Sequence, residues 1–291
     1  MDGHVVLPGE TFDFNETVGP RDEAHGYKKA PVIAEGELVD GIGGGTCQVS
    51  GTLHAAAYFA GLAIVARRPH TRPSTYIKMG LDAAVSYPAI TLKLKNTFAF
   101  PVVLHETVRA GVVRAEILGP KRTLTVTYVR KIVKIMRYAQ KERKDPKLPV
   151  GVRVLSQRGV PGFRVKKYRI VRDGPFAVRT LDYDTYPPTT QIIRVGTGSM
   201  PRDSVKIHDD RHPEYTVDEY LVITQGPGVH VKGEKKHVPG GPMVTQRTPG
   251  KTGKAGWMEK LGFPVYHSDN PPDDEPKKRH KKEHKKGHKK R

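Results

Sequence analysis

The sequence predicts an α+β fold, with one helix packed on a mostly antiparallel sheet, followed by a small all-β module and a disordered basic tail. Three observations indicate it. Apolar residues recur at helical spacing over residues 47–60. Short alternating apolar and polar segments lie on both sides of that helix. After residue 148, Gly and Pro separate strand-like segments in which no helical pattern occurs.

The segment before the helix is expected to be extended. "LPGETFDFN" places Leu7, Phe12 and Phe14 around a Pro-Gly turn, and "PVIAEGELVDG" is typical of a strand and a turn. The helix itself is predicted from Cys47 to Ala60, because alanines favour helix and apolar residues fall on one face.

Both ends of this helix carry suitable capping residues. Thr46 is the expected N-cap, and Gly61 lies where a C-terminal glycine cap belongs. Beyond it, "LAIVARR" is predicted to be a strand leading into the loop "RRPHTRPS". The segments "AITLKLKN", "FPVVLHETVRAG" and "VVRAEILG" then predict an antiparallel meander that turns near Asn96 and Gly111.

Composition divides the chain into five parts. We predict a first domain at 1–122, a basic linker at 123–147, a small all-β module at 148–200, a Pro- and Gly-rich and partly ordered segment at 201–266, and a disordered Lys/His-rich tail at 267–291. The strands of the module are expected to be four to seven residues long. Little order is expected beyond about residue 230.

The net charge of +20 indicates a polyanionic partner. The last sixteen residues contain ten Lys or Arg and one Glu, so they cannot form a core. We expect this tail to bind anionic wall polymers. It has no aromatic residue among its basic ones, which argues against nucleic acid. We predict neither a metal site nor a cofactor.

No apolar run reaches the roughly 20 residues that span a membrane. No signal peptide is visible at the start of the chain. The chain begins inside a folded pattern, which leaves open a segment upstream of Met1.

Cys47 is the single cysteine and follows "GIGGGT" at the start of the predicted helix. Unpaired backbone N–H groups and the helix dipole favour the thiolate there, and the N–H groups of Cys47 and Gln48 are expected to hold an oxyanion. Gly44 and Gly45 would let a substrate backbone approach. A phosphate-binding loop would need a Lys-Ser/Thr pair that is absent. A buried, inert cysteine remains an alternative.

A nucleophilic cysteine needs a base. His54 lies seven residues along the same helix, about 10 Å away, so it is expected to pack rather than to act as a base. His70 lies in a loop that can fold back over the helix start, and Asp82 could orient its imidazole or simply form a turn. Arg67, Arg68 and Arg72 could bind a substrate carboxylate or belong to a solvated loop.

The Pro-Gly-Glu-x-Phe opening, the "GGGTCQ" core, the "RRPH" loop and the "GLDAA" block resemble the VanW family over about residues 7–118. Residues 148–200 resemble the five-glycine (G5) wall-associated module, on "GVPGF", "RDG", "YPP" and "RVGTG". The resemblance implies an extracytoplasmic protein that acts on peptidoglycan.

Some VanW domains act as cysteine L,D-transpeptidases that form 3–3 cross-links. The resemblance implies that Cys47 is the nucleophile and His70 the motif histidine. Gln48, Tyr76 and Asp82 also fall on motif positions. The expected partners are therefore peptide stems and glycan.

The chain departs from the family pattern at "GTLHA", where His54 and Ala55 replace a usual tyrosine and asparagine. The alternative function is a non-catalytic wall-binding protein linked to glycopeptide resistance, with an inert Cys47. A polyanion-binding protein driven by the tail is a third possibility.

Overall fold

The computed structural model describes residues 1–34, 37–211, 215, 217–227, 229, 243–247, 263, 264 and 270. The predicted disordered tail at 267–291 lies outside the described residues, except for Asn270. Among the helices in these ranges, none has the length and apolar character needed to cross a lipid bilayer.

The first domain contains two three-stranded sheets and a hairpin. One sheet has the order β1-β7-β8 and the other β2-β6-β5, while β3 and β4 form the hairpin. The strands are β1 (His4–Val6), β2 (Thr11–Asp13), β3 (Lys29–Ala34), β4 (Glu37–Ile42), β5 (Ala63–Ala66), β6 (Lys93–Lys95), β7 (Val102–Arg109) and β8 (Val112–Leu118). Two short helical segments, α1 (Phe14–Val18) and η1 (Glu23–His25), join β2 to β3.

The predicted single meander is therefore wrong in one respect. β7 and β8 form the expected hairpin around Gly111, but β6 pairs with β2 and β5 rather than with β7. The reason lies at Asn96, whose side-chain amide donates to the carbonyls of Val6 and Phe100 at 2.9 and 2.8 Å. These bonds hold a wide loop in place of a tight turn, so the chain passes from one sheet to the other.

The helix α2 spans Thr46–Ala60, as the pattern predicts. Its N-cap is Gly45 rather than Thr46, with φ at 90° and no side-chain cap. Thr46 instead donates its hydroxyl to the carbonyl of Gly43 at 2.7 Å. Gly61 ends the helix in the left-handed conformation, at φ 101°.

The strand-rich module contains a five-stranded sheet of order β13-β12-β9-β15-β16 and a three-stranded sheet of order β10-β14-β11. Its strands are β9 (Thr125–Met136), β10 (Gln140–Pro149), β11 (Arg153–Gln157), β12 (Gly162–Asp173), β13 (Phe176–Tyr186), β14 (Gln191–Gly198), β15 (Tyr220–Gln225) and β16 (Met243–Arg247). A single turn, η2 (Arg202–Ser204), follows β14.

Three predictions about this module need correction. Residues 123–147, expected to be a linker, form β9 and most of β10. β9 does alternate, because Val126, Tyr128 and Ile132 are buried, but the fourth buried residue of this face is the charged Arg130, which conceals the pattern. β12 and β13 reach 12 and 11 residues, well beyond the expected four to seven. Beyond residue 230, where little order was expected, β16 pairs with β15.

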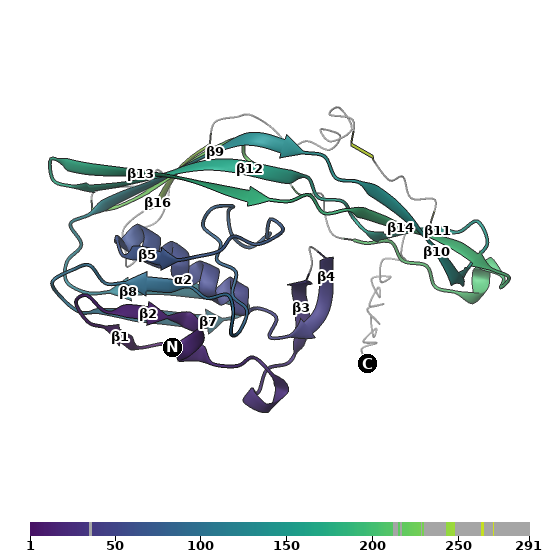
Figure 1. The fold of residues 1–291 in the computed structure, drawn as a ribbon, viewed down its shortest axis with the longest axis horizontal. Helices are drawn as coiled ribbons and strands as arrows, with labels where there is room; N and C mark the ends of the chain where they lie inside the picture. The colour runs from purple at the N-terminus through teal and green to yellow at the C-terminus, as the bar shows by residue number, and fades with distance from the viewer. Residues whose placement is uncertain are drawn as a thin grey trace, which may run out of the picture.

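The molecule has two layers with α2 between them (Figure 1). The long strands β9, β12 and β13 run along one side of the helix, and β8 and its neighbours lie on the other. One hydrophobic core joins Leu53 and Ala57 to the small sheets, and a second joins Tyr58 and Phe59 to Tyr128 of the module. Burial on both flanks explains why this helix is apolar on most of its surface.

Candidate active site

Cys47 lies in the first turn of α2, behind the glycine loop. Gly43 and Gly45 both have positive φ, 84° and 90°, so the loop requires glycine at these two positions. No atom of the described residues lies within 4 Å of the point where a Cβ of Gly45 would be. The loop is therefore open at Gly45, as an approaching substrate backbone would need.

The backbone donors of this turn are only partly free. The N–H of Gln48, predicted to line an oxyanion hole, donates to the carbonyl of Gly45 at 2.9 Å. The helix uses this donor in the structure, so Gln48 offers no free N–H there. The N–H of Cys47 has no backbone partner among the described residues and remains the available donor.

The sulfur of Cys47 is partly buried beside Val85. The Val85 N–H donates to Sγ at 3.5 Å, and the Val85 carbonyl lies at the same distance. A thiol can donate to that carbonyl, and a thiolate can accept from the N–H. Both protonation states of Cys47 therefore find a partner on the same residue.

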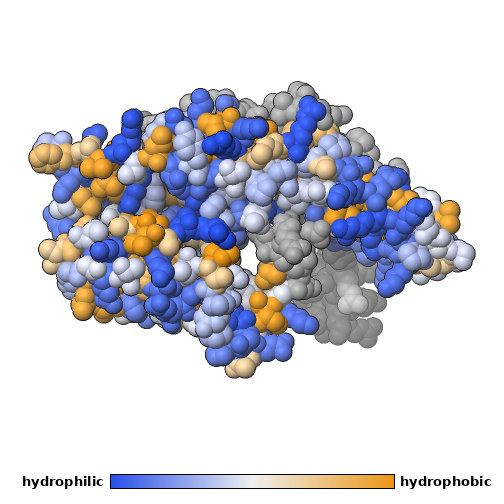
Figure 2. All heavy atoms as spheres, viewed as in Figure 1, coloured by the Kyte–Doolittle hydropathy of each residue, from blue (hydrophilic) through white to orange (hydrophobic). Residues whose placement is uncertain are grey.

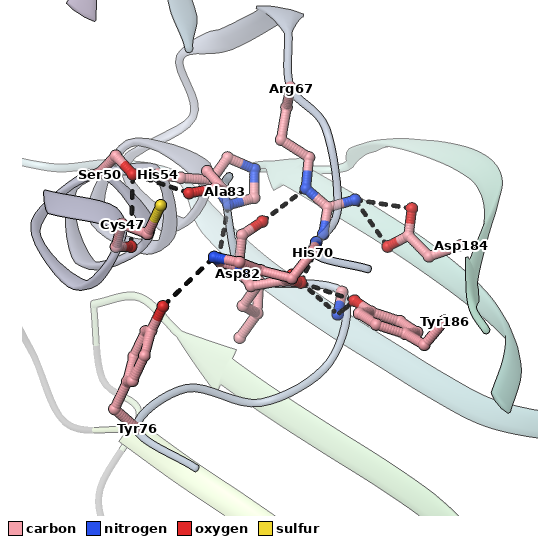
Figure 3. Close-up of polar contacts among 12 residues, drawn as sticks. Cys47, Ser50, His54, Arg67, His70, Tyr76, Asp82, Ala83, Asp184 and Tyr186 are labelled. Carbon is pink, nitrogen blue, oxygen red and sulfur yellow. Dashed lines mark hydrogen bonds and ion pairs between the residues drawn. The ribbon is translucent and has the colours of Figure 1, made fainter. Parts of the chain in front are cut away.

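His70 and Asp82 form the contact expected of a base and its orienting carboxylate (Figure 3). Nδ1–H of His70 donates to Oδ2 of Asp82 at 2.8 Å, and the backbone N–H of His70 donates to the same oxygen at 2.8 Å. This bond fixes the tautomer, so Nε2 is left to face the site. The hydroxyl of Tyr76 lies 3.3 Å from this Nε2.

Oδ1, the other oxygen of Asp82, is held by three donors. Nη2 of Arg67 donates at 2.6 Å, the hydroxyl of Tyr186 at 2.6 Å, and the Gly80 N–H at 3.2 Å. Asp82 is 1% exposed, and its charge would be costly without these partners.

Arg67 connects Asp82 to a second buried carboxylate, Asp184 on β13. Nη1 of Arg67 donates to both oxygens of Asp184 at 2.6 Å, and Nζ of Lys167 donates to Asp184 at 2.8 Å. Two cations thus balance two carboxylates in the interior. Arg67 was predicted as a substrate ligand or a solvated residue, and the structure places it in neither role.

The pKa values of the three residues favour a thiolate–imidazolium pair. Burial alone would lower the pKa of His70, but hydrogen bonds to Asp82 and Cys47 outweigh it and raise the value to about 9. Burial alone would raise the pKa of Cys47, but the bonds from His70 and Val85 and the charge of Arg21 outweigh it and lower it. Burial is outweighed in Asp82 too, where the His70 bond and the Arg67 charge hold the pKa below its ordinary value.

His54 is buried away from this chemistry. Its Nδ1–H donates to the carbonyl of Leu81 at 2.8 Å, and its ring packs edge-on against Tyr58. Burial lowers the pKa of His54 to about 3, so the side chain stays neutral. The departure from the family pattern at this position therefore contributes packing beneath the Asp82 loop.

Two further predicted residues are not brought to the sulfur. Arg72 lines a cavity of about 210 Å³ together with β11, β14 and residues 208–210, and burial lowers its pKa. The side chain of Arg68 is exposed. A larger cavity of about 1140 Å³ lies beside α2, and its lining includes Tyr76, Phe59 and Leu81 but not Cys47.

Arg21 was not singled out by its sequence, yet its charge acts on Cys47. Its guanidinium lies over the rings of Phe14 and Tyr87, 5.3 and 5.8 Å from their centroids. All three guanidinium nitrogens are buried without a hydrogen-bond partner in the described structure. Nothing in the sequence around Arg21 connects it to a cysteine 26 residues away.

We expect Arg21→Gln to raise the pKa of Cys47, because it removes a nearby positive charge. The rate of alkylation by iodoacetamide, measured against pH, gives this pKa. Arg21→Lys keeps the charge and should shift the profile less. Arg109→Gln removes an exposed charge on β7 and serves as the control. An unchanged profile in Arg21→Gln would contradict this electrostatic role.

Within the described part of the chain, no group of three or more His, Cys, Asp or Glu side chains is arranged to hold a metal ion. The arrangement around Cys47 instead has the parts of a nucleophilic acyl-transfer site. The imidazole of His70 is bonded to the buried Asp82 carboxylate and affects the pKa of the Cys47 thiol, and the Cys47 N–H has no backbone partner within the described ranges.

Comparison with known proteins matches both halves of the fold. The chain is 48% identical over 105 residues to the uncharacterized protein YoaR of Bacillus subtilis strain 168, covering 36% of this chain and 35% of YoaR. It is 31% identical over 164 residues to the vancomycin B-type resistance protein VanW of Enterococcus faecalis V583, covering 52% of this chain and 60% of VanW. The chain thus spans less than two thirds of either relative.

The G5 domain structure of IgA1 protease aligns with 28% of this chain and 99% of its own length, at 22% identity and a TM-score of 0.19. Residues 1–118 match the family described as VanW like protein. Residues 126–198 match the G5 domain. The chain therefore carries a VanW domain at residues 1–118 followed by a G5 domain at residues 126–198.

Proposed function

We propose that this chain is a peptidoglycan-modifying cysteine acyltransferase of the L,D-transpeptidase type, which acts outside the cytoplasm at the cell wall. The hydrogen bond from His70 to Asp82, together with the effect of His70 and Cys47 on each other's pKa, carries the proposal. A cysteine retained only for packing needs neither a base nor a buried carboxylate behind that base.

The reaction would proceed in two steps. The Cys47 thiolate attacks the carbonyl carbon of an amide next to a D-centre in a peptide stem, and the carbon–nitrogen bond breaks. His70, as imidazolium, gives its proton to the leaving amine, which leaves a thioester on Cys47. An acceptor amine of a second stem then attacks the thioester and returns a proton to His70. The products are a 3–3 cross-link and the free thiolate.

The tetrahedral intermediate needs a donor for its negative oxygen. The N–H of Cys47, at the positive end of α2, can provide one hydrogen bond. The open position beside Gly45 gives the stem backbone room to approach. Tyr76 is 42% exposed, and its hydroxyl lies next to His70. We propose it as the substrate contact beside the imidazole.

The G5 module would hold the enzyme on the wall. On β12 and β13, Tyr168 lies within 5.3 Å of both the Lys166 ammonium and the Arg179 guanidinium. Exposed aromatic rings stack on sugars, and cations attract anionic polymers. Hydrophobic side chains gather at the end of the molecule where β12 and β13 meet (Figure 2), and Phe176 there is 77% exposed.

The decisive test is to incubate the purified chain with disaccharide-tetrapeptides and to search by mass spectrometry for 3–3 dimers. Cys47→Ala and Cys47→Ser are expected to form none, because neither has a thiolate. Tyr220→Phe, a change at an exposed residue of β15, serves as a folded control. Dimers formed by Cys47→Ala at the wild-type rate would end the assignment.

The same preparations distinguish the alternative of a non-catalytic wall-binding protein. The cations beside the half-buried Tyr168 and the exposed Phe176 favour binding to the wall irrespective of catalysis. Cosedimentation with purified cell walls measures it. If both the wild type and Cys47→Ala bind walls and neither forms dimers, the binding function replaces the enzyme.

A further inference from the structure

We propose that Tyr186 of the G5 domain is a positioning residue of the Cys47–His70–Asp82 site, so that the second domain completes the site of the first. Each member of the proposed catalytic trio lies in the VanW domain. The group that fixes its carboxylate comes from β13, more than 100 residues further along the chain.

The hydroxyl of Tyr186 makes two hydrogen bonds to the loop that carries Asp82. It donates to Oδ1 of Asp82 at 2.6 Å and accepts from the N–H of Gly80 at 2.7 Å. The side chain is fully buried. Burial and the nearby charge of Asp82 raise the pKa of Tyr186 well above its ordinary value, so it remains a donor at any physiological pH.

A second tyrosine of the module holds the same loop. The Tyr128 hydroxyl on β9 donates to the carbonyl of Met79 at 2.6 Å. Gly80 has φ at 90°, and a Cβ there would lie 2.1 Å from the Tyr128 oxygen. Only glycine permits this approach. The Gly-x-Asp block of the VanW domain is therefore a docking loop for the module as well as the source of a carboxylate.

Charged side chains between the VanW domain and the G5 domain support the same position of Tyr186 against Asp82. Asp184 lies two residues before Tyr186 on β13, so both side chains point to the same face of the sheet. Asp184 holds Arg67, and Arg67 holds Oδ1 of Asp82. Figure 3 shows Tyr186 and Asp184 reaching Asp82 and Arg67 from the same side.

Tyr186 would act on the thiol only through Asp82. With Oδ1 fixed by Tyr186, Arg67 and Gly80, the carboxylate cannot rotate, and Oδ2 stays on Nδ1 of His70. Loss of the Tyr186 hydroxyl would let Asp82 turn toward Arg67. His70 would then hold its proton less strongly, and the thiolate of Cys47 would lose stabilisation.

The catalytic meaning of this inference rests on the proposed function, but its test does not. Alkylation of Cys47 by iodoacetamide measures the thiolate without any substrate. We expect Tyr186→Phe to move the alkylation profile to higher pH and to lower the rate on its rising limb several-fold, because a smaller fraction of Cys47 is then thiolate. Tyr220→Phe removes an exposed hydroxyl from the same sheet and should leave the rate unchanged.

A double-mutant cycle separates positioning from general destabilisation. If Tyr186 acts through Asp82, Tyr186→Phe should have no further effect on alkylation in an Asp82→Asn background. An equal effect in both backgrounds, or an unchanged pH profile in Tyr186→Phe alone, would overturn the proposal. Should Tyr186→Phe fold poorly, Asp184→Asn tests the same link through Arg67. It should also slow the alkylation of Cys47, and an unchanged pH profile would overturn the proposal.

The transfer assay then distinguishes the two proposals. Should Tyr186→Phe shift the alkylation profile while the wild type forms no 3–3 dimer, the positioning role stands and the proposed function fails. If the wild type forms dimers and Tyr186→Phe lowers kcat with little change in KM, both stand. If the wild type forms dimers and Tyr186→Phe has an unchanged alkylation profile, the proposed function stands and the positioning role of Tyr186 fails.

Discussion

Asp82→Asn is expected to lower the rate of transfer by up to about 10⁴-fold, the scale seen when the orienting carboxylate of a catalytic triad is replaced by its amide. The carboxylate of Asp82 accepts Nδ1–H of His70 and supplies the negative charge beside it. An asparagine in this position has no charge. Because Arg67 and Tyr186 require an acceptor at Oδ1, its NH₂ group would turn toward His70 and favour the wrong tautomer.

The pH dependence should change in a defined direction. In the wild type, activity should rise as Cys47 loses its proton, below the ordinary pKa of a thiol, and should fall as His70 loses its proton near pH 9. Removing the charge of Asp82 lowers the pKa of His70 and raises that of Cys47. The two limbs of the profile should therefore move toward each other, and the active range should narrow.

Rates of dimer formation and of alkylation between pH 5 and 10 measure this effect. Asp182→Asn is the matched control, since it removes the same charge from a side chain that is 68% exposed. A variant at Asp82 with wild-type rates and an unshifted profile would exclude an orienting role. A loss of transfer equal to that of Asp182→Asn would do the same.

The sequence predicts the nucleophile's surroundings because they are local. The glycine loop, α2 and Gly61 lie within 21 residues, and their conformations follow from positive φ and helix propensity. Rise per residue separates His54 from Cys47 without a structure. His70 and Asp82 were predicted as partners because the loop that carries His70 can fold back over the start of the helix. The structure brings these two residues together.

The remaining parts depend on contacts between distant segments. Nothing in the local pattern around Arg67 indicates that Asp184, 117 residues away, would take its guanidinium. The strand β9 was mistaken for a linker because a basic residue, Arg130, stands among the buried side chains of its inward face. In both cases the deciding factor is burial against another element, which a single sequence window does not contain.

Arg67→Ala is expected to reduce the free energy of unfolding by about 3–5 kcal/mol, because it leaves two buried carboxylates without their shared cation. Arg67 is 6% exposed, and its partners Asp82 and Asp184 are 1% and 4% exposed. A network on the surface would contribute far less, since water would screen each pair. The ion pairs of Arg67 link the two domains, because Asp82 belongs to the VanW domain and Asp184 to the G5 domain.

Urea denaturation followed by circular dichroism measures this loss, with Arg68→Ala as the adjacent, exposed control, expected within about 0.5 kcal/mol of the wild type. The double variant Arg67→Ala/Asp184→Ala should be less destabilised than the sum of the single variants, because it removes one of the unpaired charges. Additive losses would show that Arg67 and Asp184 do not act as a pair. Equal effects of Arg67→Ala and Arg68→Ala would mean that the buried network does not hold the VanW domain to the G5 domain.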